Sequence, residues 1–497
     1  MVIVHRLGSA GAARYYAGAV APGGGDAPLL GEAPGWWAGR RAPEAPVEAR
    51  TLAACMPDGP ARLPGLDVMF SSPKSVSVLH ALADAATVAA VRRAHDEAVS
   101  AGVAYLERHA CRVNVRGRVL AADGFVAAAF RHRTSRADDP HLHTHVVIAN
   151  CGWGPDGRRR ALHTPALYAE RRGASATYHL VLRAGLTASL GVRWAAPTAG
   201  RADVLDVPEE VRAAFSRRRA AVLDASGSLA DRRWAEHATR PPRDGLVDYE
   251  SLLFGWRRRA AFLGWSVPAG LAPRVVATAP PGAHLLPASD RWSRGDLVTV
   301  LAGYWPDGAD RATVEAATEQ LLASAAVVAR RGRFTTREAE ARAERVTAAL
   351  RSRPAVATGP EALDGLQREG RRVVVIARHD AAARLATART GVAAVGIADA
   401  PVVVDGLGPR DVVVIDPAQR LPSADVERVL GAAARRGATV LRTDASAPPH
   451  VAPAAPDVAS APPRTLEVAG GDMTIAATPR GGRRRGAGRL AGAPAAG

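Results

Sequence analysis

Three histidines, His141, His143 and His145, alternate with other residues in the run D-D-P-H-L-H-T-H-V-V-I-A-N, residues 138–150. The apolar, β-branched residues after His145 predict a buried strand, and alternate residues of a strand point to the same face of a sheet. Imidazoles bind transition metals, and three neutral ligands leave coordination positions open for a substrate. The pattern predicts a site for one divalent metal of the Mg, Mn or Zn class. A histidine-rich, exposed edge strand is the alternative.

Residues suited to phosphodiester cleavage lie upstream of the histidines. Tyr15 and Tyr16 each offer a phenol, which acts as a covalent nucleophile when a metal, base or cation assists it. Asp67 could take the tyrosine proton or orient a histidine. Lys74, the one lysine of the chain, lies at the start of a predicted helix capped by Ser72, where amides and a cation bind phosphate. Together these residues predict tyrosine-mediated cleavage of a nucleic acid.

The composition favours a polyanionic partner. The chain has 497 residues, enough for two to four domains, and carries 65 basic against 48 acidic residues, a formal charge of +17. This balance favours nucleic acid or an anionic membrane. Alanine, glycine, proline and arginine are used heavily throughout, as in the translation of GC-rich DNA, so the charge gives modest support.

Cysteine usage and hydropathy argue against a disulfide-rich, secreted or membrane-spanning protein. The three cysteines, Cys55, Cys111 and Cys151, include no C-x-x-C pair, so neither a disulfide framework nor a zinc knuckle is expected, as is typical of a cytoplasmic protein. The N-terminal M-V-I-V-H-R-L is too short and becomes polar too early for a signal peptide. No charge-free apolar run reaches about 18 residues, so no membrane span is expected.

Periodicity and helix-end signals predict an α+β first half. Strands are expected at 2–7, 66–70, 111–115, 124–132 and 142–150. Helices are expected at 10–17, from Pro73, at 85–109 and at about 165–190, the last closed by Gly191. The Gly- and Pro-rich stretch 21–64 is expected to be irregular, with a short helix or two. This order predicts an antiparallel sheet with helices on one face.

The second half of the chain has a different pattern of expected helices and strands. Residues 205–350 are expected to be mostly helical. Short β-branched runs at 371–377, 401–404 and 411–416 then alternate with helical segments, which predicts an α/β fold with a parallel sheet. From residue 445 onward, proline, alanine, glycine and arginine dominate, which predicts a disordered basic tail.

Several segments together resemble a known family. An early Y-Y, the stretches L-D-V-M-F-S-S-P-K-S-V-S and F-R-H-R-T-S-R-A-D-D-P-H-L-H-T-H-V-V-I-A-N, and a following D-G-R-R-R-A-L-H are similar to MobF-type (TrwC/TraI-like) conjugative relaxases. These form the large relaxase branch of the HUH endonuclease superfamily. The resemblance covers about residues 1–260 and is most specific at 130–150.

The resemblance implies a site- and strand-specific nick at a plasmid or integrative-element origin of transfer, which starts conjugation. A tyrosine becomes linked to the DNA 5′ phosphate and leaves a free 3′ hydroxyl. The matching catalytic positions are Tyr15, Tyr16 and Asp67, and the matching metal ligands are His141, His143 and His145. Our candidates for phosphate contacts are Lys74, Arg131, Arg133 and Arg136.

The implied partner is single-stranded DNA at a specific origin site, bound with strong salt dependence. The resemblance also suggests accessory relaxosome proteins, a coupling protein and a separate helicase as partners. The recognised DNA sequence and the physiological metal stay open.

Relatives continue into a P-loop helicase, and the second half keeps traces of one. The stretch from Asp411 resembles a Walker B strand, with Asp416 as the magnesium ligand. The phosphate loop G-x-x-x-x-G-K-[ST] is missing, because residues 356–366 read V-A-T-G-P-E-A-L-D-G-L without a lysine. Pro417 also replaces the acidic residue that usually follows Asp416. We therefore expect no nucleotide cofactor and no ATPase or helicase activity.

The expected organisation has four parts. They are a relaxase (HUH endonuclease) domain at 1–265, a helical connector at 266–350, a degenerate helicase-like α/β domain at 351–445 and a disordered basic tail at 446–497.

Three other functions compete with this hypothesis. An HUH replication initiator or transposase-like nickase shares the chemistry, but the helicase traces argue against it. A decayed DNA-binding protein without catalysis is disfavoured by the intact tyrosine pair, Asp67 and the histidines. A cupin-like metal oxygenase needs a downstream glutamate and a distant histidine in a small barrel, and the strand pattern does not match one.

Overall fold

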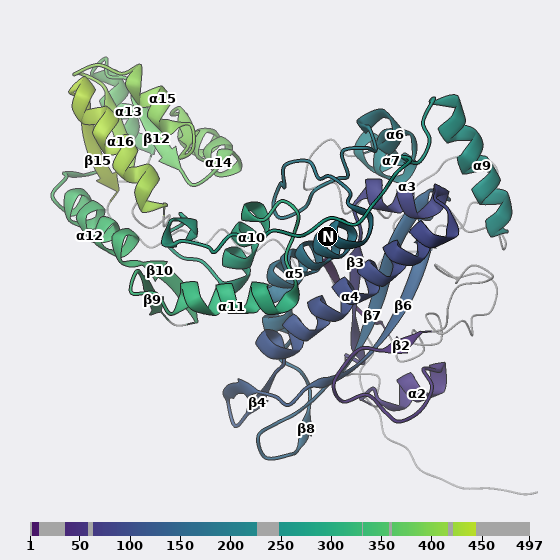
Figure 1. Cartoon of the computed structure of the whole chain (residues 1–497). Helices are drawn as coiled ribbons and strands as arrows, with labels where there is room; N and C mark the ends of the chain where they lie inside the picture. Colours follow the sequence, from purple (N-terminus) through teal and green to yellow (C-terminus); the bar gives the residue numbers. More distant parts are fainter. Residues whose placement is uncertain are drawn as a thin grey trace, which may run out of the picture. The chain divides into compact units, whose positions relative to one another are not determined.

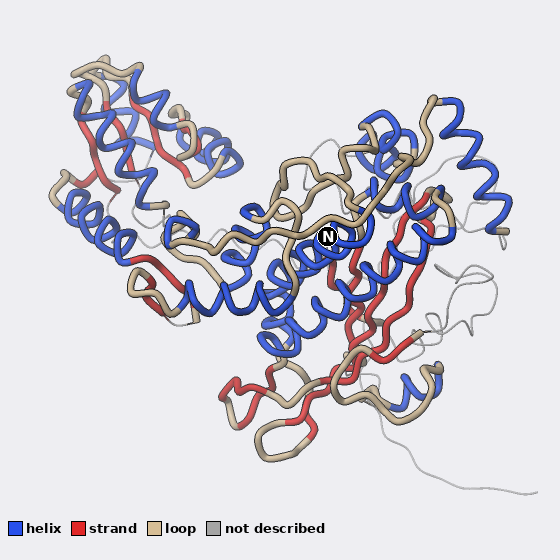
Figure 2. Tube along the Cα trace, in the orientation of Figure 1, coloured by secondary structure: helices blue, strands red, loops and turns tan. Residues whose placement is uncertain are grey.

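The computed structural model describes residues 2–8, 35–57, 63–225, 248–330, 332–356, 360–415 and 421–443. Figures 1 and 2 show the helices and strands of this part of the chain. Tyr15, Tyr16 and Asp416 lie outside the described residues. The predicted helix at 10–17 and the predicted tail at 446–497 lie outside them as well.

The first half of the chain is built on an antiparallel sheet. Its strands pair in the order β1-β3-β7-β6-β2, and β8 pairs with the end of β7. These strands are β1 (Val2–Arg6), β2 (Trp36–Trp37), β3 (Gly65–Ser71), β6 (Phe125–Thr134), β7 (Pro140–Trp153) and β8 (Arg159–Arg160). A separate hairpin joins β4 (Arg112–Val115) to β5 (Arg118–Ala121). The predicted antiparallel sheet is confirmed with four of its predicted strands, whereas the predicted strand at 111–115 belongs to the separate hairpin.

Two long helices cover one face of this sheet. The helices of the first half are α2 (Ala49–Ala54), α3 (Lys74–Leu82), α4 (Ala85–Ala110), α5 (Thr164–Leu190), α6 (Glu209–Ala214), α7 (Arg217–Asp224) and α9 (Tyr249–Phe262). Helices α4 and α5 pack side by side (Figure 1). The predicted end of α5 is confirmed, because Gly191 has a φ of 62° and a Cβ there would collide with the carbonyl oxygen of Ala272.

Alternation along β7 gives the sheet two distinct faces. Val146 and Ile148 enter the large core shared with α4 and α5. Val147 and Ala149 point the other way and pack with Leu52 of α2 in a smaller cluster. The sheet is therefore buried on both faces along most of β7.

The predicted helical connector, 266–350, contributes to two cores. It contains η1 (Ala283–Leu285), α10 (Arg294–Tyr304), α11 (Arg311–Leu322), β9 (Val327–Arg330), β10 (Arg333–Thr336) and α12 (Arg337–Arg351). Helices α10 and α11 pack against α5, and Trp292 and Trp305 are buried in the same core as the sheet. Helix α12 instead places Val346 and Leu350 in the core of the second half. The first core thus extends well past residue 265.

The second half contains a five-stranded parallel sheet in the order β11-β15-β14-β12-β13. The strands are β11 (Ala355–Val356), β12 (Val373–Ala377), β13 (Ala394–Gly396), β14 (Val412–Ile415) and β15 (Thr439–Thr443). The helices are α13 (Pro360–Arg368), α14 (Asp380–Thr390), α15 (Ala400–Asp405) and α16 (Ser423–Arg436). Alternate residues of β12 enter separate apolar clusters, as in a parallel sheet covered on both faces. The predicted parallel α/β arrangement is confirmed.

Two local predictions are wrong. The run 401–404 lies in helix α15, because Pro401 suits a first helical turn. This helix buries Val404 in the core and leaves Val402 79% exposed. Ser72 does not cap α3, which begins one residue later than expected with Pro73 at the N-cap. The Ser72 hydroxyl lies 2.9 Å from that of Ser77 instead. Within the described ranges, no helix combines the length and apolar character that crossing a membrane requires.

A buried arginine joins α5 to α10. Arg183, two turns before the end of α5, is 1% exposed. Its guanidinium donates to the carbonyl oxygens of Gly200 at 2.8 Å, Ala302 at 2.6 Å and Trp305 at 3.0 Å. Burial lowers the pKa of this guanidinium to about 10, with Asp307 opposing the shift. The side chain therefore stays charged at neutral pH and satisfies carbonyls at the end of α10.

Replacing this arginine should destabilise the first core. We expect Arg183→Met to lower the free energy of unfolding by about 3 kcal/mol, because three buried carbonyls lose their donor. Tryptophan fluorescence during urea unfolding measures this core, since all nine tryptophans lie between residues 36 and 305. Arg171→Met, an exposed position on the same helix, is the matched control and should stay within about 0.5 kcal/mol of the parent protein. Equal stability of the two variants would contradict the role given to Arg183.

Candidate metal centre

Three imidazoles gather where β6 and β7 pair. His132 of β6 lies opposite His143 of β7, and His145 follows two residues later. The three ring centroids are 5.1, 5.2 and 5.3 Å apart, and the ligand nitrogens lie within 4.8 Å of one another. All three residues are buried. Three nitrogens this near one another can converge on one ion, and imidazole donors suit a divalent transition metal.

The cluster differs from the predicted triad in one member, because His132 stands in place of His141. Four residues along a strand span about 13 Å, so His141 and His145 cannot readily share one ion. A residue directly across an antiparallel pair is only about 5 Å away, as His132 is from His143. His141 instead stacks on His143, with ring centroids 4.4 Å apart. Burial, followed by the proximity of His143 and Lys74, lowers the pKa of His141.

Hydrogen bonds fix two of the imidazoles. Asp67 of β3 is 4% exposed, and both of its carboxylate oxygens lie 2.9 Å from Nδ1 of His145. Nδ1 of His143 lies 2.8 Å from the carbonyl oxygen of His141, to which it donates. A donating Nδ1 leaves Nε2 as the ligand atom in each ring. Of the two roles predicted for Asp67, this geometry favours orientation of a histidine.

The turn between β6 and β7 is held by later helices. The Asp139 carboxylate is 1% exposed and accepts from Nε of Arg217 at 2.9 Å and from the Arg259 guanidinium at 3.2 Å. The indole of Trp256 donates to the carbonyl oxygen of Asp138 at 2.9 Å. Helices α7 and α9 therefore fix the point at which the histidine-bearing strand β7 begins.

The predicted phosphate site at the start of α3 is occupied by a carboxylate of the chain itself. Asp203 accepts from the Ser75 amide at 3.1 Å and from the Ser75 hydroxyl at 2.6 Å. Lys74 donates to the carbonyl oxygen of Pro140 at 2.7 Å. Burial lowers the pKa of Lys74 to about 8, with Asp139 opposing the shift. Lys74 thus joins α3 to the start of β7, and Ser75 joins α3 to the segment between α5 and α6.

The predicted phosphate contacts on β6 do not lie with the imidazoles. Arg131 and Arg133 alternate with His132 and so point to the face of β6 that α4 covers. Arg131 donates to Asp96 of α4. Arg136 lies in the turn between β6 and β7. The distance from Tyr15 and Tyr16 to the histidines stays a prediction, since both tyrosines lie outside the described residues.

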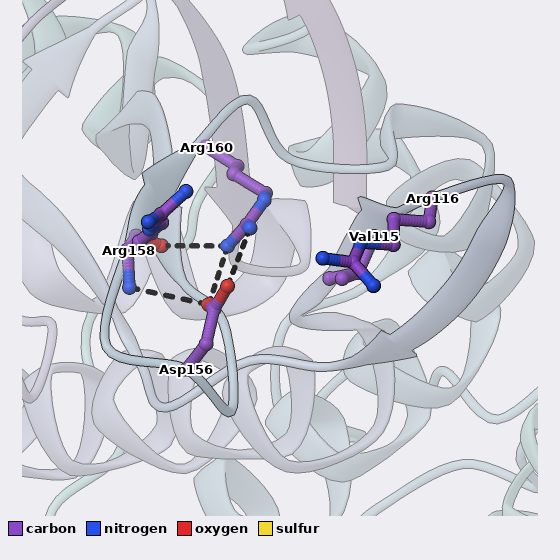
Figure 3. A pocket seen from close by; sticks show the side chains of 5 residues that line it. All are labelled: Val115, Arg116, Asp156, Arg158 and Arg160. Carbon is purple, nitrogen blue, oxygen red and sulfur yellow. Dashed lines mark hydrogen bonds and ion pairs between the residues drawn. The ribbon is translucent and has the colours of Figure 1, made fainter.

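A basic pocket of about 500 Å³ lies elsewhere in the first half (Figure 3). It is lined by Val115 and Arg116 of the β4–β5 hairpin and by Asp156, Arg158 and Arg160 around the β7–β8 turn. Asp156 pairs with the Arg160 guanidinium through two hydrogen bonds of 2.6 Å. The remaining two arginines give the pocket a positive charge, which agrees with a polyanionic partner.

Comparison with known proteins assigns the family. Residues 9–263, just over half of the chain, match the family described as TrwC relaxase. The chain belongs to the TrwC relaxase family. The TrwC relaxase region contains all three clustered histidines and Asp67.

Two curated relatives agree with this assignment. Multifunctional conjugation protein TraI of Escherichia coli is 31% identical over 220 residues, which cover 41% of this chain and 12% of that protein. The protein of the same name from Escherichia coli strain K12 is 34% identical over 143 residues, covering 24% of this chain and 8% of that protein. The chain thus matches only about a tenth of the length of these relatives.

Solved structures of TrwC are also similar to this chain. The structure of TrwC complexed with a 27-mer DNA comprising the recognition hairpin and the cleavage site is 27% identical, with a TM-score of 0.45. The metal-bound structure of TrwC in complex with oriT DNA gives the same two values. Each match covers 54% of this chain and 100% of the solved chain.

Metal titration can decide whether His132 or His141 is the third ligand beside His143 and His145. We expect His132→Ala to abolish stoichiometric binding of Co²⁺ or Zn²⁺, because two imidazoles on one strand cannot complete the site. His141→Ala should retain binding, since this ring lies outside the cluster. Isothermal titration calorimetry of the metal-stripped protein measures both variants. Loss of binding in His141→Ala with retention in His132→Ala would restore the originally predicted triad.

Proposed function

We propose that this chain nicks one DNA strand at a specific site in an origin of transfer and so starts conjugative transfer in the cytoplasm. The observation that carries the proposal is the cluster of His132, His143 and His145, oriented by Asp67, in a member of the TrwC relaxase family. The substrate is single-stranded DNA, extruded or melted at that site. The positive charge of the chain supports this class of substrate.

The three imidazoles are the proposed ligands of one divalent metal. When bound, such an ion polarises a phosphoryl oxygen and offsets the charge that develops on the phosphate. The chain supplies neutral nitrogen donors, and the buried Asp67 keeps His145 in the tautomer that presents Nε2. Because the cluster in the described residues provides three ligands, positions remain for substrate oxygens.

We infer that Tyr15 or Tyr16 is the nucleophile. The phenol oxygen forms a bond to phosphorus while the bond between phosphorus and the 3′ oxygen breaks. The phenol loses its proton and the leaving oxygen gains one, which yields a 5′-phosphotyrosine and a free 3′ hydroxyl. Adjacent residues on the predicted helix point about 100° apart, so one phenol at a time would face the imidazoles.

We infer that the second half does not hydrolyse ATP. Its parallel sheet agrees with a degenerate motor domain, but residues 356–366 lack the lysine and glycine loop that cradle nucleotide phosphates. Unwinding during transfer would then need a separate helicase. Accessory relaxosome proteins and a coupling protein are the other proposed partners.

A nicking assay tests the proposed reaction. Supercoiled plasmid carrying the origin of the protein's own element, incubated with Mg²⁺ or Mn²⁺, should yield nicked DNA with covalently attached protein. The variant with both Tyr15→Phe and Tyr16→Phe should lose the adduct, because no phenol remains at the proposed position. Tyr168→Phe, on α5, is the control and should retain it. A covalent adduct formed by the double variant would refute the nucleophile assignment.

ATP hydrolysis is tested separately. Purified full-length protein, with and without single-stranded DNA, should release no phosphate from ATP above the level of a protein-free blank. Phosphate release that DNA stimulates would contradict the inference of an inactive motor domain, and would leave the proposed nicking reaction untouched.

A further inference from the structure

Three buried polar side chains form a chain of hydrogen bonds between the two long helices and the histidine-bearing strand. His95 of α4, Thr144 of β7 and Tyr178 of α5 are each 0% exposed. Nε2 of His95 lies 2.7 Å from the Thr144 hydroxyl. Nδ1 of the same ring lies 2.9 Å from the Tyr178 hydroxyl. The His95 imidazole therefore connects α5 to β7.

Thr144 brings this chain of bonds next to the clustered imidazoles. It stands between His143 and His145 in the sequence, and because side chains alternate along a strand it points to the opposite face. Its neighbours on that face, Leu142 and Val146, belong to the core shared with α4 and α5. Since one stretch of backbone carries all three residues, a displacement of Thr144 would move both imidazoles.

The pairing of β7 with β6 is irregular close to this point. Its register shifts between His132 and Thr134, just beyond the pair formed by His132 and His143. An irregularity of this kind disrupts the ladder of backbone hydrogen bonds locally. The bond from His95 to Thr144 thus adds a constraint from the helices where strand pairing becomes less regular.

Stability alone does not explain why an imidazole and two hydroxyls lie in an apolar core. Burial, followed by the proximity of Arg131, lowers the pKa of His95, so the ring is neutral and has one donor and one acceptor nitrogen. Each nitrogen has a hydroxyl partner, which offsets the cost of burial. Such a network adds little net stability over apolar side chains of the same shape, but it favours one packing arrangement.

We propose that His95 and Thr144 are positioning residues for the candidate metal centre. Their hydrogen bond holds the part of β7 that carries His143 and His145, and Tyr178 holds the His95 ring in turn. Both residues lie on the opposite face of the sheet from the imidazoles and act only through the strand. That the centre serves DNA nicking rests on the proposed function, whereas metal binding is measured without DNA.

Titration of the metal-stripped full chain with Co²⁺, followed by calorimetry and visible absorption, tests the role. Thr144→Val removes the hydroxyl and keeps a branched side chain. We expect it to lower the association constant about tenfold and to change the absorption spectrum at saturation, because the ligands no longer hold the same geometry. Thr144→Ser keeps a hydroxyl and should retain the parent affinity and spectrum.

Two further variants separate positioning from a general effect on the core. Thr318 of α11 is 1% exposed, and its hydroxyl donates to the carbonyl oxygen of Val314 at 2.7 Å. Thr318→Val removes a buried hydroxyl far from β7 in sequence and should leave Co²⁺ affinity and spectrum unchanged. Tyr178→Phe removes the other partner of His95 and should weaken binding in the same direction as Thr144→Val.

Two outcomes would overturn the positioning role. One is the parent affinity and spectrum in Thr144→Val, and the other is an equal loss of affinity in Thr318→Val. Urea unfolding identifies a misfolded variant, and if Thr144→Val is misfolded, Tyr178→Phe decides. A parent protein that binds no Co²⁺ would refute the metal centre and the positioning role together, whereas normal binding by the parent and both test variants would refute the positioning role alone.

Discussion

The antiparallel register between β6 and β7 is the constraint on which the proposed chemistry depends. It places His132 across from His143, and a shift of one residue would turn His132 to the other face of the sheet. The turn that sets this register is held by Asp139, a buried carboxylate that accepts from Arg217 and Arg259. Helices that come about 80 and 120 residues later in the chain thus help to define the geometry of the imidazoles.

The sheet separates two kinds of side chain on the same strand. Because side chains alternate along β6, His132 lies on the same face as His143 and His145, while Arg131 and Arg133 face α4. The imidazoles are neutral ligands, whereas the arginines supply fixed charge. A single strand therefore carries an imidazole on one face and guanidiniums on the other, so the guanidiniums do not lie beside the clustered imidazole nitrogens.

Local patterns predicted much of the fold, because the alternation of apolar and polar residues and the signals at helix ends depend only on residues close together in the sequence. They predicted the four longer strands of the first sheet, though not β2 and β8, the closure of α5 at Gly191 and two of the three clustered histidines. They missed His132, since its place depends on pairing with another strand. They also missed Asp203 at the start of α3, which contacts Ser75 across 128 residues of sequence. Such contacts leave no local periodicity to detect.

The single lysine has a practical consequence. Lys74 is the chain's one side-chain amine, and burial lowers its pKa to about 8. A larger fraction of this amine is uncharged near neutral pH than for an ordinary lysine, yet its bond to the Pro140 carbonyl and its burial limit access. Amine-directed labelling would thus modify one internal position, and its rate would report how often the junction between α3 and β7 opens.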